Sequence, residues 1–204
     1  MSYNSILNLC GGKIKSIFGE NSYNPYFLLN LDQIYFTKNT MEEVVENHQL
    51  FIDESRFGAL QNIETYINFD AYQFLERYNI PFDLITIYRF LEHVPKSNVL
   101  YFIYLLSTCT EPGAMIDVIV PDYRHLAERI LNENPFKLGF ESEDIITTYE
   151  LLNDMPSPHL SIWTDARIKY FFELEGRFKL VKTELDYKFD GRSIYLRSLL
   201  KRVW

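Results

Sequence analysis

A carboxylate and an imidazole stand side by side at Glu92-His93, shortly after an apolar run at residues 82–88. That run is rich in β-branched and aromatic residues, which is typical of a strand buried on both faces of a parallel sheet. Ligands of such sheets bind beyond the carboxyl ends of the strands. Glu92 or His93 could therefore orient a group that accepts a substituent in a transfer reaction, or remove a proton from it. Alternatively, both side chains could hydrogen-bond neighbouring loops and fix the floor of the site.

A glycine pair, Gly11-Gly12, directly follows a short apolar run at residues 6–9. Glycine lets the backbone turn sharply and come close to a ligand. Asp32 closes the next apolar run, about 20 residues after Gly12, where folds of this kind hold ribose hydroxyls. An ordinary capping role at a strand end is the alternative for Asp32.

Strand-like apolar runs alternate with segments of helical spacing along much of the chain. The strands are predicted at residues 6–9, 26–31, 64–69, 82–88, 115–120, 178–189 and 193–200. Helices are predicted at residues 40–48, 70–77, 99–110, 123–131, 143–152 and 165–175. Glu111-Pro112-Gly113 is expected to stop the third of these helices, and Asp190-Gly191 to join the last two strands as a hairpin.

This order of elements predicts one α/β domain over residues 1–204. The expected architecture is a doubly wound, Rossmann-like, mostly parallel sheet of seven strands with a C-terminal antiparallel hairpin, in three α/β/α layers. Residues 133–163 are rich in Pro, Asn and Ser and predict a cap or lid over the end of the sheet.

The composition is that of a soluble globular protein, with 47% hydrophobic and 24% charged residues among 204. The net charge of −8 argues against general attraction to nucleic acid, although it does not exclude a local basic patch. Cys10 and Cys109 lack metal or redox spacing, and we interpret them as free thiols in a reducing compartment. No signal peptide or membrane-length apolar run is present, so we expect a soluble cytoplasmic protein.

Six stretches together resemble the class I S-adenosylmethionine-dependent methyltransferases, in particular the small-domain group with LNLGCG and FD…LEHV motifs. The stretches are Leu7-Asn8-Leu9-Cys10-Gly11-Gly12, Asn30-Leu31-Asp32, Phe82-Asp83-Leu84-Ile85, Leu91-Glu92-His93-Val94, Glu111-Pro112-Gly113 and Val120-Pro121-Asp122. They occur in the family's order, and the likeness runs from about Ile6 to Leu199.

The resemblance implies S-adenosylmethionine as the cofactor and assigns residues of this chain to each part of it. The implied contacts are Asn8, Cys10, Gly11 and Gly12 at the methionine end, Asp32 at the ribose, Phe69, Asp70 and Ala71 around the adenine, and Tyr88 and Arg89 under the sulfonium. Asp70 is also a natural helix N-cap, which is its structural alternative. His125 and His159 fall in the region expected to roof the substrate side, or they are packed loop residues.

One departure from the family concerns Cys10, which stands where the family has its first glycine. Its side chain would crowd the closest backbone approach, so cofactor binding could be weakened or lost. We interpret Cys10 as a small buried side chain that fills space, not as a nucleophile, because no His or Asp lies at a spacing diagnostic of an activated thiol. Ala114, in place of the final glycine of the family's EPGG turn, is expected to be harmless.

The resemblance implies methyl transfer to an unidentified acceptor, which could be a small molecule, a sugar or a protein side chain. Nucleic acid is less expected because the chain is acidic. The alternative is a catalytically inactive methyltransferase-fold protein that serves as a binding or scaffold subunit. A nicotinamide-dependent oxidoreductase is disfavoured by the missing GxGxxG and by the terminal hairpin. No metal motif is recognised, since His48 and its helix neighbours Glu42 and Glu46 lack the spacing.

Overall fold

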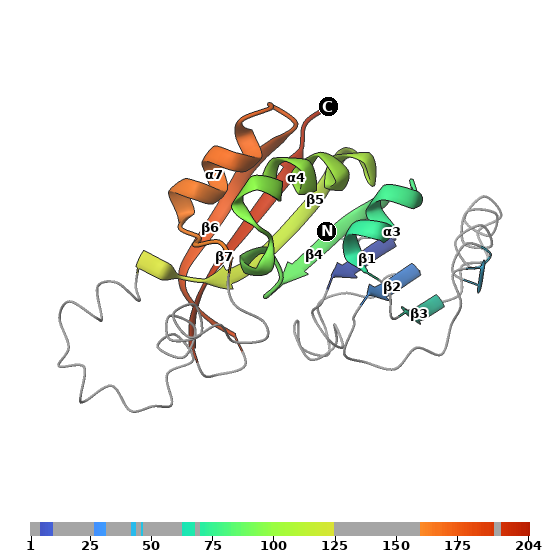
Figure 1. Cartoon of the computed structure of the whole chain (residues 1–204), viewed down its shortest axis with the longest axis horizontal. Coiled ribbons are helices and arrows are strands. Elements are labelled where there is room, and N and C mark those ends of the chain that lie inside the picture. The colour runs from blue at the N-terminus through green and yellow to red at the C-terminus, as the bar shows by residue number, and fades with distance from the viewer. Residues whose placement is uncertain are drawn as a thin grey trace.

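The computed structural model describes residues 5–9, 27–31, 42–43, 46, 63–67, 70–124, 160–189 and 193–204. Seven strands form one sheet in the order β3-β2-β1-β4-β5-β7-β6 (Figure 1). Their bounds are β1 Ser5–Leu9, β2 Phe27–Leu31, β3 Ile63–Ile67, β4 Phe82–Tyr88, β5 Thr110–Pro121, β6 Phe178–Phe189 and β7 Ser193–Arg202.

The first five strands are mutually parallel, and β7 runs antiparallel to both β5 and β6. The prediction of an α/β protein with a Rossmann-like, mixed sheet is therefore confirmed. Parallel strands need crossover connections, which explains why helical segments separate the apolar runs of the sequence.

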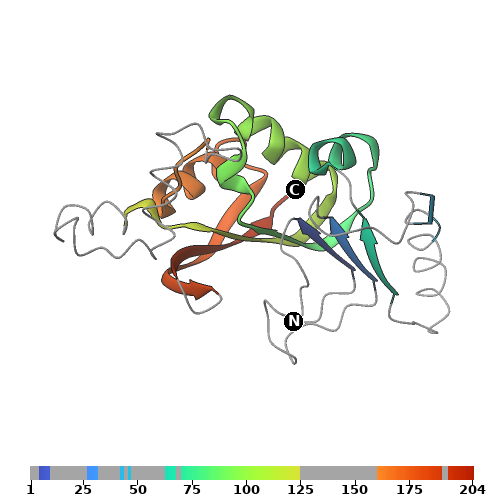
Figure 2. The same ribbon diagram turned by 60° about the horizontal axis from the view of Figure 1, so that its bottom comes forward.

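The helices with described bounds lie on one face of the sheet (Figure 2). They are α3 Ala71–Arg77, α4 Val99–Thr108 and α7 Asp165–Glu173. Two 3-10 turns, η1 Leu91–His93 and η2 Lys96–Asn98, lie between β4 and α4. The helices predicted at residues 40–48, 123–131 and 143–152 lie mostly outside the described residues. The third layer therefore stays a prediction. None of the described helices has the length and apolar character needed to cross a bilayer.

Two helix starts predicted from capping residues are confirmed. The Asp70 carboxylate accepts a hydrogen bond from the Gln73 amide at 2.9 Å, and α3 begins at the next residue. The Thr164 hydroxyl accepts one from the Arg167 amide at 3.3 Å, and α7 begins at Asp165. Each oxygen satisfies an amide that the first helical turn leaves without a partner.

The predicted end of α4 is wrong. The helix ends at Thr108, and Glu111-Pro112-Gly113 lies inside β5. Hydroxyl groups end the helix early, because Thr108 Oγ1 donates to the Leu105 carbonyl at 2.8 Å and Thr110 Oγ1 to the Leu106 carbonyl at 3.0 Å. Gly113 has a φ of +98° and lies where the register between β4 and β5 shifts, so the glycine serves an irregularity of the strand.

The main core lies between this helical layer and the sheet. Side chains with no exposed surface come from α4 and α7 and from the facing positions of β4, β5 and β7, among them Phe102, Phe172, Ile85, Val118 and Leu196. A second buried group, Tyr88, Ile119 and Tyr195, packs apart from that core. The sheet is therefore buried on both faces along β4 and β5, as a central parallel strand requires.

Candidate functional site

The strand order reverses between β1 and β4, two neighbouring parallel strands. β1 pairs with β2 on one side and β4 on the other, with Leu9 opposite Ile87 at their carboxyl ends. Such a reversal leaves a crevice beyond the strand ends, where ligands of open α/β sheets bind. The predicted site residues that the structure describes lie along or next to the carboxyl ends of the parallel strands. They belong to β1, β4, η1 and the start of α3.

Asn8 lies within β1, next to its last residue, and is buried. Its side-chain oxygen accepts a hydrogen bond of 2.8 Å from the Thr86 hydroxyl on β4. The amide therefore helps to hold the two strands of the reversal together, which is a positioning role at the edge where a ligand would lie.

Tyr88 ends β4 and is directed into a buried ionic network. Its hydroxyl donates to Asp117 at 3.1 Å, and Arg197 of β7 donates to both oxygens of that carboxylate at 3.0 and 2.7 Å. Burial alone would lower the pKa of Arg197, but the hydrogen bonds to Asp117 outweigh it, so that the pKa is raised and the guanidinium stays charged. Sequence reasoning did not find this network.

Arg89 has a left-handed backbone, with a φ of +52°. Only a small fraction of non-glycine residues adopts this conformation, and functional sites are enriched in it. Its amide donates to the Ile119 carbonyl at 2.9 Å, and its exposed guanidinium lies 6.0 Å from the centre of the Tyr195 ring. The Arg89 side chain thus extends over β5 and β7.

Glu92 and His93 form a 3-10 turn that is tied to residues 160–163. The Glu92 carbonyl accepts from the amides of Leu160 and Ser161 at 2.7 and 3.0 Å. Trp163, which is fully buried, donates from Nε1 to the Ser161 hydroxyl at 2.8 Å and to the Leu91 carbonyl at 3.2 Å. Glu92 is itself fully buried, whereas His93 is partly exposed. These bonds join the main chain of Glu92, not its carboxylate, to residues 160–161, so both roles considered for the side chains of Glu92 and His93 stay predictions.

Asp70 caps α3 and Ala71 begins it, beside a group of aromatic rings. Tyr72 lies 5.3 Å from Phe102 of α4, and Phe90, which follows Arg89, lies 5.5 Å from Phe102, measured between ring centres. Burial, and secondarily the charge of Asp70, raises the pKa of Tyr72 to about 12, so its hydroxyl stays protonated. Phe102 belongs to the main core, and Tyr72 and Phe90 pack against that core with part of their surface exposed.

Seven predicted site residues lie outside the described part of the chain: Cys10, Gly11, Gly12, Asp32, Phe69, His125 and His159. Most of the predicted cap at residues 133–163 also lies outside it. Among the residues that the structure does describe, no group of three or more His, Cys, Asp or Glu side chains could hold a metal ion.

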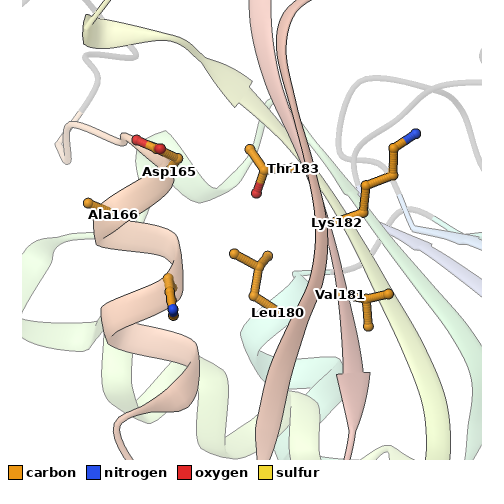
Figure 3. Close-up of a pocket in the computed structure, with 7 residues that line it drawn as sticks. Asp165, Ala166, Leu180, Val181, Lys182 and Thr183 are labelled. Carbon is orange, nitrogen blue, oxygen red and sulfur yellow. The ribbon is translucent and has the colours of Figure 1, made fainter.

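Two hollows lie away from the strand reversal. A small one of about 120 Å³ is lined by Lys182, Glu184, Arg197 and Leu199. A larger one of about 490 Å³ lies between α7 and β6 (Figure 3). Leu180 and Thr183 point into the larger hollow, whereas Val181 and Lys182 point away from it, in keeping with the bulge at this place in β6. Neither hollow brings together groups that suggest a reaction.

No protein-family model and no curated protein sequence matches the chain. Solved structures match it over its whole length. The N-methyltransferase NodS of Bradyrhizobium japonicum WM9 is 10% identical with a TM-score of 0.53, and the match covers 100% of this chain and 88% of NodS. A second match is to magnesium protoporphyrin IX methyltransferase of Synechocystis PCC 6803 with bound S-adenosylhomocysteine. It has 13% identity, a TM-score of 0.53, and coverage of 98% and 74%.

A third match is the 1,6-didemethyltoxoflavin-N1-methyltransferase of Burkholderia thailandensis, bound to 1,6-didemethyltoxoflavin and S-adenosylhomocysteine. It is 9% identical with a TM-score of 0.57, and the match covers 100% of this chain and 72% of that enzyme. The chain thus shares the fold of these methyltransferases, and at such low identity the likeness concerns the fold alone.

Proposed function

We propose that the protein is an S-adenosylmethionine-dependent methyltransferase of class I. The observation that carries the proposal is the reversal of strand order between β1 and β4, within a sheet ordered β3-β2-β1-β4-β5-β7-β6. Among the residues that the resemblance assigns to the cofactor, Asn8 lies in β1, and Tyr88 and Arg89 lie at the end of β4, the two strands that border this reversal. Asp70 follows β3, in the same half of the sheet. The chain acts in this proposal as a single domain.

The described residues suit the cofactor in chemistry and place. An ionised carboxylate offers about four acceptor positions, so the Asp70 carboxylate can receive the adenine amino group as well as the Gln73 amide. Tyr72 and Phe90 offer an apolar wall for the ring beside it. The Arg89 guanidinium lies over Tyr195, so only the backbone at 88–89 needs to approach the sulfonium, which avoids contact between two cations.

When bound, the cofactor would supply an electrophilic methyl carbon on a sulfonium, and an attacking acceptor would displace the neutral thioether from that carbon in line. Holding donor and acceptor in line accounts for much of such catalysis, and the protein contributes position rather than a fixed triad. In this proposal the bonds from residues 160–161 to the Glu92 carbonyl fix η1, and His93 faces the acceptor. If the methyl acceptor has to lose a proton before the transfer, His93 takes that proton as a general base.

A second candidate function is a binding or scaffold subunit that keeps the fold without catalysis, and Cys10 in the glycine turn favours it. Isothermal titration with S-adenosylmethionine and S-adenosylhomocysteine separates the two. We expect both to bind the intact chain and Asp32→Ala to abolish binding. Lys169→Gln, an exposed change on α7, is the control and should bind like the parent. A folded parent that binds neither compound would exclude the methyltransferase.

A further inference from the structure

Strand β6 forms one edge of the sheet, at the end of the strand order opposite β3. One side of β6 pairs with β7, and within the described part of the chain no strand lies on its other side. An unpaired edge offers backbone amides and carbonyls to another chain. The side chains along β6 indicate which chain fits there.

The register between β6 and β7 shifts twice, at Val181 and again at residues 185–186. The side chains of Val181 and Leu185 are apolar, yet 56% and 40% exposed. The first stands two residues before Thr183 and the second two residues after it. If β6 met its own copy antiparallel about Thr183, Val181 would therefore lie opposite Leu185 of the second copy, and each irregularity would lie opposite the other.

The charges beside Thr183 have the same symmetry. Lys182 and Glu184 stand on either side of it and form an ion pair within the chain. In the twofold arrangement Lys182 also lies opposite Glu184 of the second copy, so the charges alternate in sign around the axis. An axis at Lys182 or at Glu184 would instead place like charges directly opposite each other, which is destabilising. Thr183 meets its own copy on the axis, and opposed threonines are a favourable pair.

Helix α7 repeats this symmetry at the same level. It runs opposite to β6, and the Leu180 amide donates to the Glu173 carboxylate at 2.9 Å, which aligns these two residues. From residue 173 back to 167 the helix covers about 9 Å. From residue 180 on to 183 the strand covers about 10 Å. The axis at Thr183 thus passes midway between Asp165 and Lys169, which line the hollow beside β6 (Figure 3). Across the axis, Asp165 would face Lys169 of the second copy.

We propose that the protein forms a twofold dimer through β6, with antiparallel pairing centred on Thr183. Each contact of such an interface occurs twice, so the paired surface has to be complementary to itself. The exposed apolar residues, the charges of β6 and the charges of α7 all meet this condition about one axis. The Glu173 carboxylate already binds the Leu180 amide, so the strand pairing covers residues 181–185.

Lysines and bulges also occur on edge strands that avoid pairing. A lysine repels another strand when no carboxylate faces it, and a bulge disturbs pairing when the opposite strand runs straight. In the proposed dimer Lys182 faces a carboxylate, and each irregularity of β6 faces an irregularity of the copy. An unrelated strand would not share this pattern, which favours a second copy as the occupant.

Charge reversal on the two chains of the dimer tests the position of the axis. Lys182→Glu would place carboxylates opposite each other, and Glu184→Lys would do the same with ammonium groups. Each variant should therefore dimerise at least about tenfold more weakly than the parent, measured by sedimentation velocity over a range of concentrations. An equimolar mixture of the two variants should form a mixed dimer, because each reversed side chain then faces an opposite charge on the other chain.

Lys96→Glu, a change of an exposed lysine between β4 and α4, is the matched control and should dimerise like the parent. Val181→Asp tests the apolar contact independently, should Glu184→Lys fail to fold beside Arg197. It should weaken the dimer and leave the far-UV circular dichroism unchanged, since Val181 is exposed. A parent that sediments as a monomer at every concentration overturns the proposal. So does a dimer that survives both reversals, or a mixture of the two folded variants that stays monomeric.

Discussion

At the scale of single residues, the Asp117–Arg197 pair is the most consequential feature. Asp117 has no exposed surface, and Arg197 donates to both of its oxygens. Arg197→Met would leave a carboxylate buried without its counter-charge, which costs about 3–5 kcal/mol of folding free energy. Urea unfolding followed by circular dichroism measures this loss.

Glu184 supplies the control for that experiment. Its carboxylate also faces Arg197, at 3.8 Å, but is one-third exposed. Glu184→Gln should therefore cost no more than about 1 kcal/mol. Equal losses in Arg197→Met and Glu184→Gln would show that burial of Asp117 does not decide the energy.

The pair also shows where residue-level prediction from the sequence stops. Asp117 and Arg197 are 80 positions apart, and each is an ordinary polar residue within an apolar strand. Only the pairing of β5 with β7 brings them together, and that register is a tertiary property. Asp70 could be predicted because a capping oxygen acts on an amide three residues away, within the reach of a local pattern.

The buried thiol of Cys109 should make the free energy of unfolding depend on pH. Burial raises the pKa of its thiol from 9.0 to about 11, although a hydrogen bond with Thr108 opposes this. Below pH 9 the thiol is protonated in both folded and unfolded chains, so its contribution to stability is fully present. Between pH 9 and about 11 the unfolded chain ionises first, and the free energy of unfolding falls by about 3 kcal/mol.

Other groups titrate in the same range, so the difference from Cys109→Ala isolates the thiol. That variant should lose stability at neutral pH through the small cavity it creates. It should then converge on the parent as the pH rises from 9 to 11 in urea unfolding experiments. Parallel curves for the two proteins over this range would contradict the raised pKa.

At the scale of elements, α7 depends on its first hydrogen bond. Thr164 caps the helix through the Arg167 amide, and α7 buries only Ile168 and Phe172 fully. Thr164→Ala should cost about 1 kcal/mol in urea unfolding, whereas Thr164→Ser keeps the oxygen and should cost little. A Thr164→Ser variant as unstable as Thr164→Ala would show that the methyl group, not the cap, matters.

Elements with strong periodic patterns were predictable, and those that depend on neighbours were not. Residues 82–88 read as a buried strand, and β4 occupies the same residues. Glu111-Pro112-Gly113 carries the local signal of a helix stop, yet hydroxyl groups ended α4 earlier and pairing with β4 drew these residues into β5. Proline and glycine predict that the chain is irregular at this place. Whether they end a helix or interrupt a strand depends on tertiary pairing.

At the scale of the whole molecule, the order of motifs anticipated the class of fold better than the details of the site. Asp70 and Arg89 follow strands, and Tyr88 ends one, whose carboxyl ends share one edge of the sheet, which alternating strands and helices imply. Tyr195 under Arg89 and Ser161 beside η1, in contrast, come from the last third of the chain. No local pattern marks those contacts, because they arise from packing between distant segments.

The glycine turn predicted at residues 10–12 would decide between enzyme and scaffold, and thermal unfolding can test it. A ligand that binds the folded chain at 100 times its Kd adds about 2.7 kcal/mol of stability. Cys10→Gly removes the side chain that would crowd the backbone approach, so S-adenosylhomocysteine should raise the Tm of this variant more than that of the parent. Cys109→Ala, the control, changes a buried thiol outside the site and should leave the shift unaltered. S-adenosylhomocysteine could instead shift the Tm of Cys10→Gly and leave the Tm of the parent unchanged. That result would mean that the Cys10 thiol alone prevents binding, and it would support the scaffold alternative.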